Sequence, residues 1–175
     1  MRSLLRADRA TPASRLTFLV ASSLVFVGGC LAHEKELRAL AYMGARFSPP
    51  GDTTEIHWVS GVRDDDSGLG LGLTDTKLRE ALPYLKPLHR LHLDLVGTSV
   101  TDESMPQIAR LDHLEELNVA GLGVSARGLE SLRDARGLRR IYVATGQITR
   151  PEADRLRRMM PKASLLNGRG DPVVP

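Results

Sequence analysis

The sequence contains a single cysteine, Cys30, in 175 residues, and aromatic residues make up only 4% of it. One cysteine excludes an internal disulfide framework and any metal site built from several cysteines. Because aromatic residues are few, the core must be aliphatic, built mainly from Leu and Val. The hydrophobic and charged fractions, 42% and 26%, are those of an ordinary globular protein. This length fits one domain with a tail.

Excess positive charge is absent beyond the first 30 residues. The whole chain has 24 basic and 21 acidic residues, and the first 30 residues hold four arginines and one aspartate. The rest of the chain therefore has 20 basic and 20 acidic residues. A nucleic-acid-binding protein usually presents a basic face or stripe. The basic clusters at residues 136–140 and 155–158 are typical of solvated surface. We therefore expect no nucleic-acid partner.

The N-terminal segment has the pattern of an export signal. Residues 1–15 are rich in arginine, and residues 16–29 carry no charge. A positive region followed by a short apolar run is typical of a signal peptide, and this run is shorter than the roughly 20 residues that span a bilayer. Residues 1–29 are therefore predicted to be a signal peptide that exports the domain from the cytoplasm.

The end of the apolar run, VGGC at residues 27–30, resembles the lipobox of bacterial lipoproteins. In that family the cysteine thiol receives a diacylglycerol, and the cysteine becomes the N-terminus after cleavage. The resemblance implies lipidation of Cys30 and a lipoprotein anchored to a membrane of the cell envelope. Two or more acyl chains anchor a protein firmly. An uncleaved signal anchor and simple secretion remain as alternatives.

A repeat of 24 residues occupies the second half of the chain. Segments that begin at Leu93, Leu117 and Ile141 align with one another. Each starts with the two-residue period of a short strand and continues with the 3.6-residue period of a helix. A partial unit comes earlier, with its helix pattern from Leu73 and its strand at residues 55–59.

A hydroxyl residue stands in each full unit where the strand pattern gives way to the helix pattern: Thr101, Ser125 and Thr149. Such a hydroxyl can accept hydrogen bonds from the first free N–H groups of a helix. Glu152 follows Thr149 by three residues, which predicts a capping box.

These units resemble the leucine-rich repeat family, in particular its short bacterial type, through GTSVTD at residues 97–102. The resemblance covers residues 55–166 and implies an α/β solenoid with a short parallel β-sheet on the concave face and helices on the convex face. Stacked units share one core and need caps at their ends. Residues 30–54 are predicted to form an N-terminal cap helix and turn, and residues 167–175 a disordered tail.

Two departures from the repeat pattern carry structural predictions. Thr98, Leu122 and Gly146 occupy the position where the family usually has Asn or Cys. An asparagine ladder is therefore absent, and we expect the turn bonds to come from Thr98, backbone groups or water. The stretch around residues 89–92 is longer than the later junctions, which predicts a bulge there.

The exposed face of the strands is the candidate site. Its predicted central column is His57, Asp94, Asn118 and Tyr142, and a flanking column is Glu55, His92, Glu116 and Arg140. Strands are spaced about 4.8 Å apart, so four of them make a patch about 15 to 20 Å wide. Tyr and Arg are types that anchor protein interfaces. The predicted partner-binding residues are His57, His92, Asp94, Glu116, Asn118, Arg140 and Tyr142.

These features predict a non-enzymatic, membrane-tethered leucine-rich repeat module that binds a protein or peptide in the cell envelope. We expect a monomer with no catalytic residues, no metal and no cofactor. Two alternatives stay open: a structural spacer without a specific partner, and a metal-dependent envelope factor using His57, His92 and Asp94. Calcium binding by three aspartates at residues 64–66 is a further open question.

Overall fold

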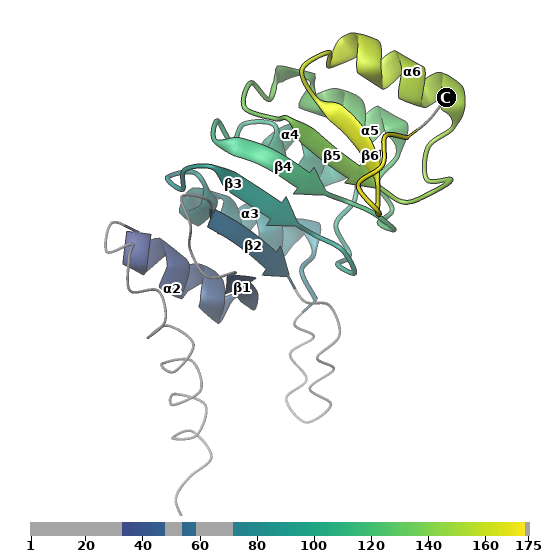
Figure 1. Ribbon diagram of the computed structural model, residues 1–175. Coiled ribbons are helices and arrows are strands. Elements are labelled where there is room, and N and C mark those ends of the chain that lie inside the picture. The colour runs from purple at the N-terminus through teal and green to yellow at the C-terminus, as the bar shows by residue number, and fades with distance from the viewer. Residues whose placement is uncertain (1–32, 48–53, 59–71, 174–175) are drawn as a thin grey trace, which may run out of the picture.

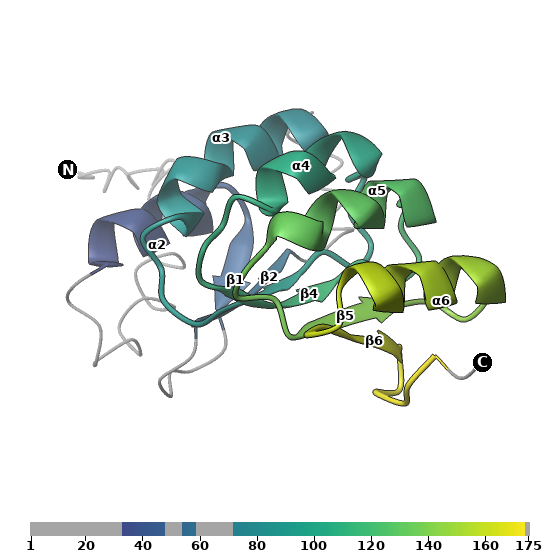
Figure 2. The ribbon, with the colours of Figure 1, turned by 90° about the horizontal axis from the view of Figure 1, so that it is seen from above.

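The computed structural model describes residues 33–47, 54–58 and 72–173. The predicted signal peptide, Cys30 and the three aspartates at residues 64–66 lie outside these ranges. The described chain has an α/β fold, in which a six-stranded sheet carries its strands in chain order. The helices cover one face of this sheet (Figure 1), and Figure 2 shows the two layers from above. The predicted α/β class is confirmed.

Five consecutive strands of the sheet are parallel, and the first strand is antiparallel to the second. The strands are β1 (Ala45–Phe47), β2 (Thr54–Trp58), β3 (Leu91–Asp94), β4 (Leu114–Asn118), β5 (Arg140–Val143) and β6 (Ser164–Asn167). Leu93, Leu117, Ile141 and Leu165 lie opposite one another across β3 to β6. The spacing of these partners is the 24-residue period of the sequence.

Helical segments connect the parallel strands, as a parallel arrangement requires. These segments are α3 (Asp75–Leu85), η2 (Asp102–Ser104), α4 (Met105–Ile108), α5 (Ala126–Glu130), η3 (Ser131–Asp134) and α6 (Arg150–Met159), whereas α2 (Glu34–Tyr42) precedes the first strand. We call a parallel strand with the helices that follow it a unit, so that β2, β3, β4 and β5 open units one to four. Thr101 and Ser125 accept hydrogen bonds from helical N–H groups, as predicted.

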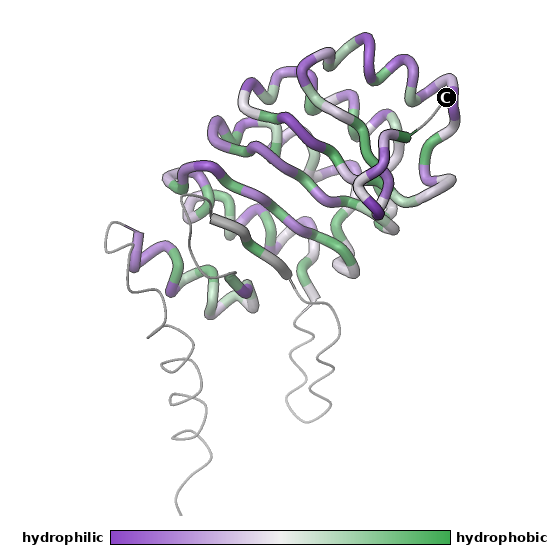
Figure 3. Tube along the Cα trace, in the orientation of Figure 1, coloured by the Kyte–Doolittle hydropathy of each residue, from purple (hydrophilic) through white to green (hydrophobic). Residues whose placement is uncertain are grey.

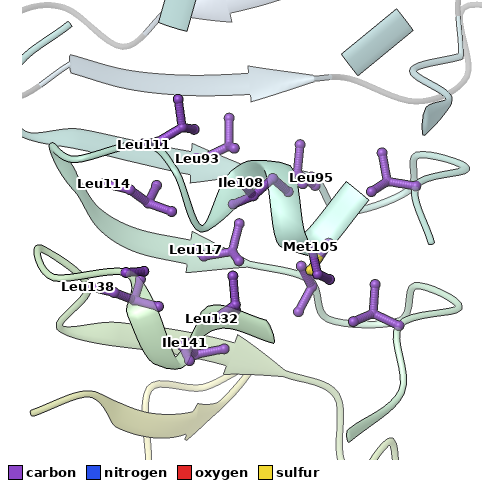
Figure 4. Close-up of a cluster of buried hydrophobic side chains, with 14 of the residues drawn as sticks. Leu93, Leu95, Met105, Ile108, Leu111, Leu114, Leu117, Leu132, Leu138 and Ile141 are labelled. Atoms are coloured by element: carbon purple, nitrogen blue, oxygen red, sulfur yellow. The ribbon is translucent and has the colours of Figure 1, made fainter. Parts of the chain in front are cut away.

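One aliphatic core fills the space between the sheet and the helices (Figure 4). Leu93 and Leu117 from the strands and Ile108 and Leu132 from the helices are at most 1% exposed. Strand residues alternate between buried and partly exposed, and Figure 3 shows the matching alternation of hydropathy along β3. The buried hydrophobic residues of the described chain include no aromatic side chain. The predicted aliphatic core is therefore confirmed.

Two aspartates join the first three units. Asp75 accepts hydrogen bonds from the Thr101 N–H at 3.0 Å, from Thr101 Oγ1 at 2.9 Å and from Ser104 Oγ at 2.5 Å. Asp102 accepts from the N–H and the hydroxyl of Ser125 at 2.7 and 2.6 Å. Each carboxylate lies in the first helical turn of one unit and accepts hydrogen bonds from the start of the helix in the next unit. It thereby satisfies donors that have no partner within their own helix.

The hydrogen bonds at the first junction change the acidity of Asp75. Partial burial, the largest single influence, acts to raise its pKa, but the hydrogen bonds from Ser104 and Thr101 and the nearby Arg79 together lower the pKa below its ordinary 3.8. Asp75 is therefore held in its charged form. Ser104 is only 2% exposed, so its hydroxyl depends on this carboxylate.

The junction between units three and four is built differently. Ala126 occupies the position of the two aspartates, and Thr149 donates its N–H and hydroxyl to Glu152 of its own helix at 2.8 and 2.6 Å. The predicted capping box is confirmed. These hydrogen bonds, of which the one from the Thr149 hydroxyl contributes most, lower the pKa of Glu152.

Gln147 supplies the bonds that cross this third junction. Its Nε2 donates to the carbonyl oxygens of Val119 and Val124, both at 3.1 Å, and its Oε1 accepts from the Gly121 N–H at 3.1 Å. Thr98 holds its own turn, with Oγ1 donating to the Leu95 carbonyl oxygen at 2.8 Å. The predicted role of Thr98 is confirmed. Gln147 was missed because it lies one position after the family's usual Asn or Cys.

The predicted bulge is present, but the extra residue lies on β4. Leu91 pairs with Leu114, whereas His92 pairs with Glu116, so the register shifts between Leu91 and His92. Glu115 is the unpaired residue. Two glutamates consequently lie next to each other beside His92.

Both ends of the described sheet differ from the sequence-based expectation. The cap helix α2 is confirmed, but β1 was not predicted; it follows a turn at Gly44, whose φ of +90° suits glycine. The prediction of a disordered tail is wrong for residues 167–173. Val173 N–H donates to the Leu165 carbonyl at 3.0 Å, and Leu166 forms an antiparallel bridge with Pro172. The tail returns because β6 is an edge strand with unpaired backbone groups.

Candidate binding face of the sheet

The face of the sheet opposite the helices presents the predicted columns. We call it the open face; the predicted side chains that the structure describes on it are His92, Asp94, Glu116, Asn118, Arg140 and Tyr142, and Ser164 and Leu166 of β6 continue the two columns. Asp94, Asn118 and Tyr142 lie opposite one another in the register, and so do His92, Glu116 and Arg140. The backbone of His57 pairs with Asp94, but its side chain lies outside the described residues. The predicted register of both columns is confirmed.

Glu116 is the centre of a hydrogen-bonded network across three strands. Arg140 donates to its Oε1, Tyr142 OH donates to its Oε2 at 3.1 Å, and His92 Nε2 lies 3.1 Å from its Oε1. The Glu116 side chain is 13% exposed, whereas that of Arg140 is 51% exposed. The carboxylate is therefore covered by the groups that it positions, and Arg140 is the member of the network that faces solvent.

Burial and the network together raise the pKa of the Tyr142 phenol. Burial has the largest effect and raises its pKa, as do the charge of Glu116 and the hydrogen bond to it, while Arg140 acts in the opposite direction. The net effect is a pKa above the ordinary 10.0. A phenol fixed as a donor to Glu116 keeps its ring in one orientation on the open face.

The bulge adds a second acid to the network. Glu115 Oε1 lies 3.7 Å from Arg90 Nε, and Glu115 Oε2 lies 3.9 Å from His92 Nε2. The Arg90 side chain is 51% exposed and that of Glu115 is 24% exposed. The arrangement seen around Glu116 is thus repeated, with an arginine placed outside a more buried carboxylate.

Asp94 and Asn118 have a second role that the sequence analysis missed. Asp94 Oδ1 accepts from the Val96 N–H at 3.0 Å, and Asn118 Oδ1 accepts from the Ala120 N–H at 3.2 Å. Asp and Asn side chains commonly fix a turn two residues further on. Their position directly before a glycine-containing segment was the available signal. Two members of the central column therefore also hold the turns that follow their strands.

Three of the five histidines come together away from the open face. The rings of His33 and His89 have their centroids 5.7 Å apart, and those of His89 and His113 are 4.6 Å apart, both edge to face. His89 and His113 are 24 residues apart, so the repeat period places them on neighbouring units, whereas His33 lies outside the repeats and gave no signal. Within the described ranges, no group of three or more His, Cys, Asp or Glu residues could hold a metal ion. The described side chains do not form the proposed metal site around His92 and Asp94.

A hollow of about 390 Å³ lies between the end of η3 and the end of α6. Its lining combines apolar side chains with basic ones: Leu132, Arg133, Ala135, Arg136, Leu138, Met159, Met160, Pro161, Lys162 and Ala163. No helix among the described residues has both the length and the apolar character needed to cross a bilayer. Comparison of the chain with models of known protein families gives no match, and comparison with curated proteins gives none.

Proposed function

We propose that this chain is a leucine-rich repeat solenoid, tethered to a bacterial envelope membrane through acylated Cys30, that binds a protein or peptide through its open face without catalysis. The regular 24-residue register of β3 to β6, with helices on one side only, supports the repeat assignment. The VGGC sequence stands at the end of the arginine-rich and apolar N-terminal segment, directly before a domain with equal numbers of acidic and basic residues, and this supports the tether. Among the described elements the helices all lie on one side of the sheet, so none of them covers the open face.

The network around Glu116 is the observation that carries the binding proposal. Arg and Tyr dominate the energetics of many interfaces, and a side chain held in place before binding loses less entropy on association. Arg140 and Tyr142 are both held by Glu116 and lie on adjacent positions of the same strand face. Exposed Val96 adds an apolar contact at the end of β3. This surface fits a peptide or loop that presents a carboxylate next to an apolar side chain.

The double variant Arg140→Ala/Tyr142→Ala tests the binding face. Photo-crosslinking in cells, followed by mass spectrometry, should enrich a partner with the wild-type protein and lose it with the variant. With the purified partner, we expect Kd to rise by about 1,000-fold, because two interface hot spots of about 2 kcal/mol each amount to nearly three factors of ten. The helix-side variant Arg127→Ala/Tyr84→Phe is the matched control. A variant that captures the partner as well as wild type contradicts the proposal.

The tether has its own test. Intact mass spectrometry of the protein purified from bacterial membranes should show cleavage before Cys30 and added acyl mass. Cys30→Ser should abolish both and move the protein out of the membrane fraction. A wild-type protein that carries no acyl group contradicts the lipoprotein assignment, and leaves the open-face proposal to its separate experiment.

A further inference from the structure

The loops that precede the parallel strands concentrate basic residues. We call these loops, residues 86–90, 109–113, 135–139 and 160–163, the entry edge, because parallel strands begin at one edge of a sheet. They contain six basic residues and one acidic residue: Lys86, Arg90, Arg110, Asp112, Arg136, Arg139 and Lys162. His89 and His113 lie on the same edge. Neutrality of the domain as a whole hides this local excess.

At the opposite edge, the loops that the structure describes between strands and helices lack this charge. The loops that follow β3, β4 and β5, residues 95–101, 119–125 and 144–149, contain no Asp, Glu, Lys or Arg. The domain is therefore strongly polarised along the direction of its strands. This uneven charge gives the domain a preferred orientation on an anionic surface, with the basic edge towards it.

The chain enters the domain at the basic edge. His33, directly before α2, places its ring against His89, which in turn contacts His113. Only Leu31 and Ala32 separate Cys30 from His33. Three residue steps span at most about 10 Å when fully extended. That distance is close to the screening length at physiological ionic strength, about 8 Å.

We propose that the entry edge binds the phosphate groups of anionic phospholipids in the membrane that holds Cys30; this inference rests on the proposed tether. Lysine and arginine near an anionic membrane surface attract it, and their effects accumulate. Arg110, Arg136 and Lys162 are exposed, and the last two border the hollow beside partly exposed Met159. The hollow gives a phospholipid head group a basic rim for its phosphate and an apolar floor for its glycerol carbons.

Docking at this edge fixes the orientation of the domain. The strands then run away from the membrane, because the edge at which they begin lies on it. The open face looks sideways, along the membrane plane, with Arg140 at the membrane end of β5 and Tyr142 two residues further along the strand. A partner is then presented by another envelope protein lying beside the domain rather than above it.

Hydrogen exchange of the acylated full-length protein tests this orientation. The protein is reconstituted into vesicles of phosphatidylcholine alone, or of an equal mixture of phosphatidylcholine and phosphatidylglycerol. We expect slower exchange in the four entry-edge loops on the anionic vesicles only, reversed by high salt. The loops at the opposite edge should exchange equally on both.

Charge reversal at the edge should remove the protection. The variant Arg110→Glu/Arg136→Glu/Lys162→Glu is expected to weaken docking at least 100-fold, since each basic residue near the surface contributes about fivefold. The control variant Arg127→Glu/Arg150→Glu/Arg169→Glu carries the same charge change on residues outside the entry edge and should keep the protection. The proposal is overturned if the entry-edge loops exchange hydrogen at the same rate on both kinds of vesicle. It is also overturned if the charge-reversal variant and the control variant lose the protection equally.

The experiment distinguishes a wrong prediction of lipid contact at the entry edge from a wrong prediction of acylation at Cys30. Intact mass shows directly whether the reconstituted protein is acylated at Cys30. An acylated protein whose entry edge exchanges at the same rate on both vesicles overturns only the lipid contact. A protein that lacks the acyl group overturns the tether, and with it the premise of the lipid contact.

Discussion

The first two junctions between units and the third join equivalent elements but use different polar chemistry. Asp75 and Asp102 each bind the helix start of the following unit. At the third junction Ala126 replaces the carboxylate, and Glu152 and Gln147 take over its tasks from within unit four. The apolar pattern therefore sets the register of the strands, since it is common to all units. The polar side chains can differ from junction to junction, provided that each satisfies the N–H and hydroxyl donors at the start of a helix. Breaking each kind of bond separately tests this difference.

The largest loss is expected from Asp75→Ala. The substitution leaves the Thr101 N–H and hydroxyl and the buried Ser104 hydroxyl without their acceptor. Unsatisfied buried donors cost about 1 to 3 kcal/mol each, and solvent will rescue those at the surface, so we expect a loss of about 3 kcal/mol in the free energy of unfolding. Denaturant titration measures it. Asp112→Ala, at an exposed aspartate in a loop, is the control and should change stability by less than about 0.5 kcal/mol.

Gly128→Ala should weaken the second junction by about 2 kcal/mol. A Cβ at this position would lie 2.1 Å from Asp102 Oδ1, so the carboxylate must turn away from Ser125. The loss occurs even though alanine favours helix more than glycine does. Gly123→Ala is the matched control, because nothing lies within 4 Å of its added Cβ. A Gly128→Ala protein as stable as wild type would show that the second junction does not depend on Asp102.

Gln147→Ala should cost between about 1 and 2 kcal/mol, the effect of losing several partly exposed hydrogen bonds. The loss should be confined to the third junction, where its amide joins the turn of unit three to unit four. Thermal unfolding gives the size of the effect, and hydrogen exchange at Gly121 gives its location. If exchange accelerates at residues 95–101 as much as at Gly121, the junctions do not act separately.

Lowering the pH should weaken the first junction before the core unfolds, and this change in stability is the smallest of the expected effects. The pKa of Asp75 is lowered in the folded protein, so its stabilisation is complete above the ordinary 3.8 and is lost as the pH falls through the lower folded value. Asp75→Asn should therefore flatten the fall in stability below about pH 4. Urea titrations at stepwise lower pH measure this slope. The same slope for wild type and Asp75→Asn would contradict the assigned role.

The parts of the fold that follow from local patterns were predictable. Leu93, Leu117 and Ile141 fix the strand register through their common spacing, and Thr149 with Glu152 forms the capping box that its sequence indicates. Alternation along the strands then places Glu116 and Arg140 on one face. These predictions succeeded because each depends on residues close in sequence or separated by a constant period.

The missed features depend on contacts between distant residues. Asp75 is an ordinary first-turn acid until the stacking of units brings Thr101 to it, 26 positions later. The histidines at 33 and 89 meet because α2 and the loop before β3 lie at one edge of the domain. The basic edge was missed because charge was summed along the chain, whereas the relevant quantity is charge on one side of the fold.

The sheet ends with antiparallel partners on both sides, and this limits what the protein can assemble into. At one end β1 is only three residues long and offers few backbone groups; at the other the returning tail covers β6, and Pro172 has no N–H to donate. A second copy therefore finds little edge on which to continue the sheet. We therefore expect the described sheet to resist edge-to-edge aggregation with other copies of the chain.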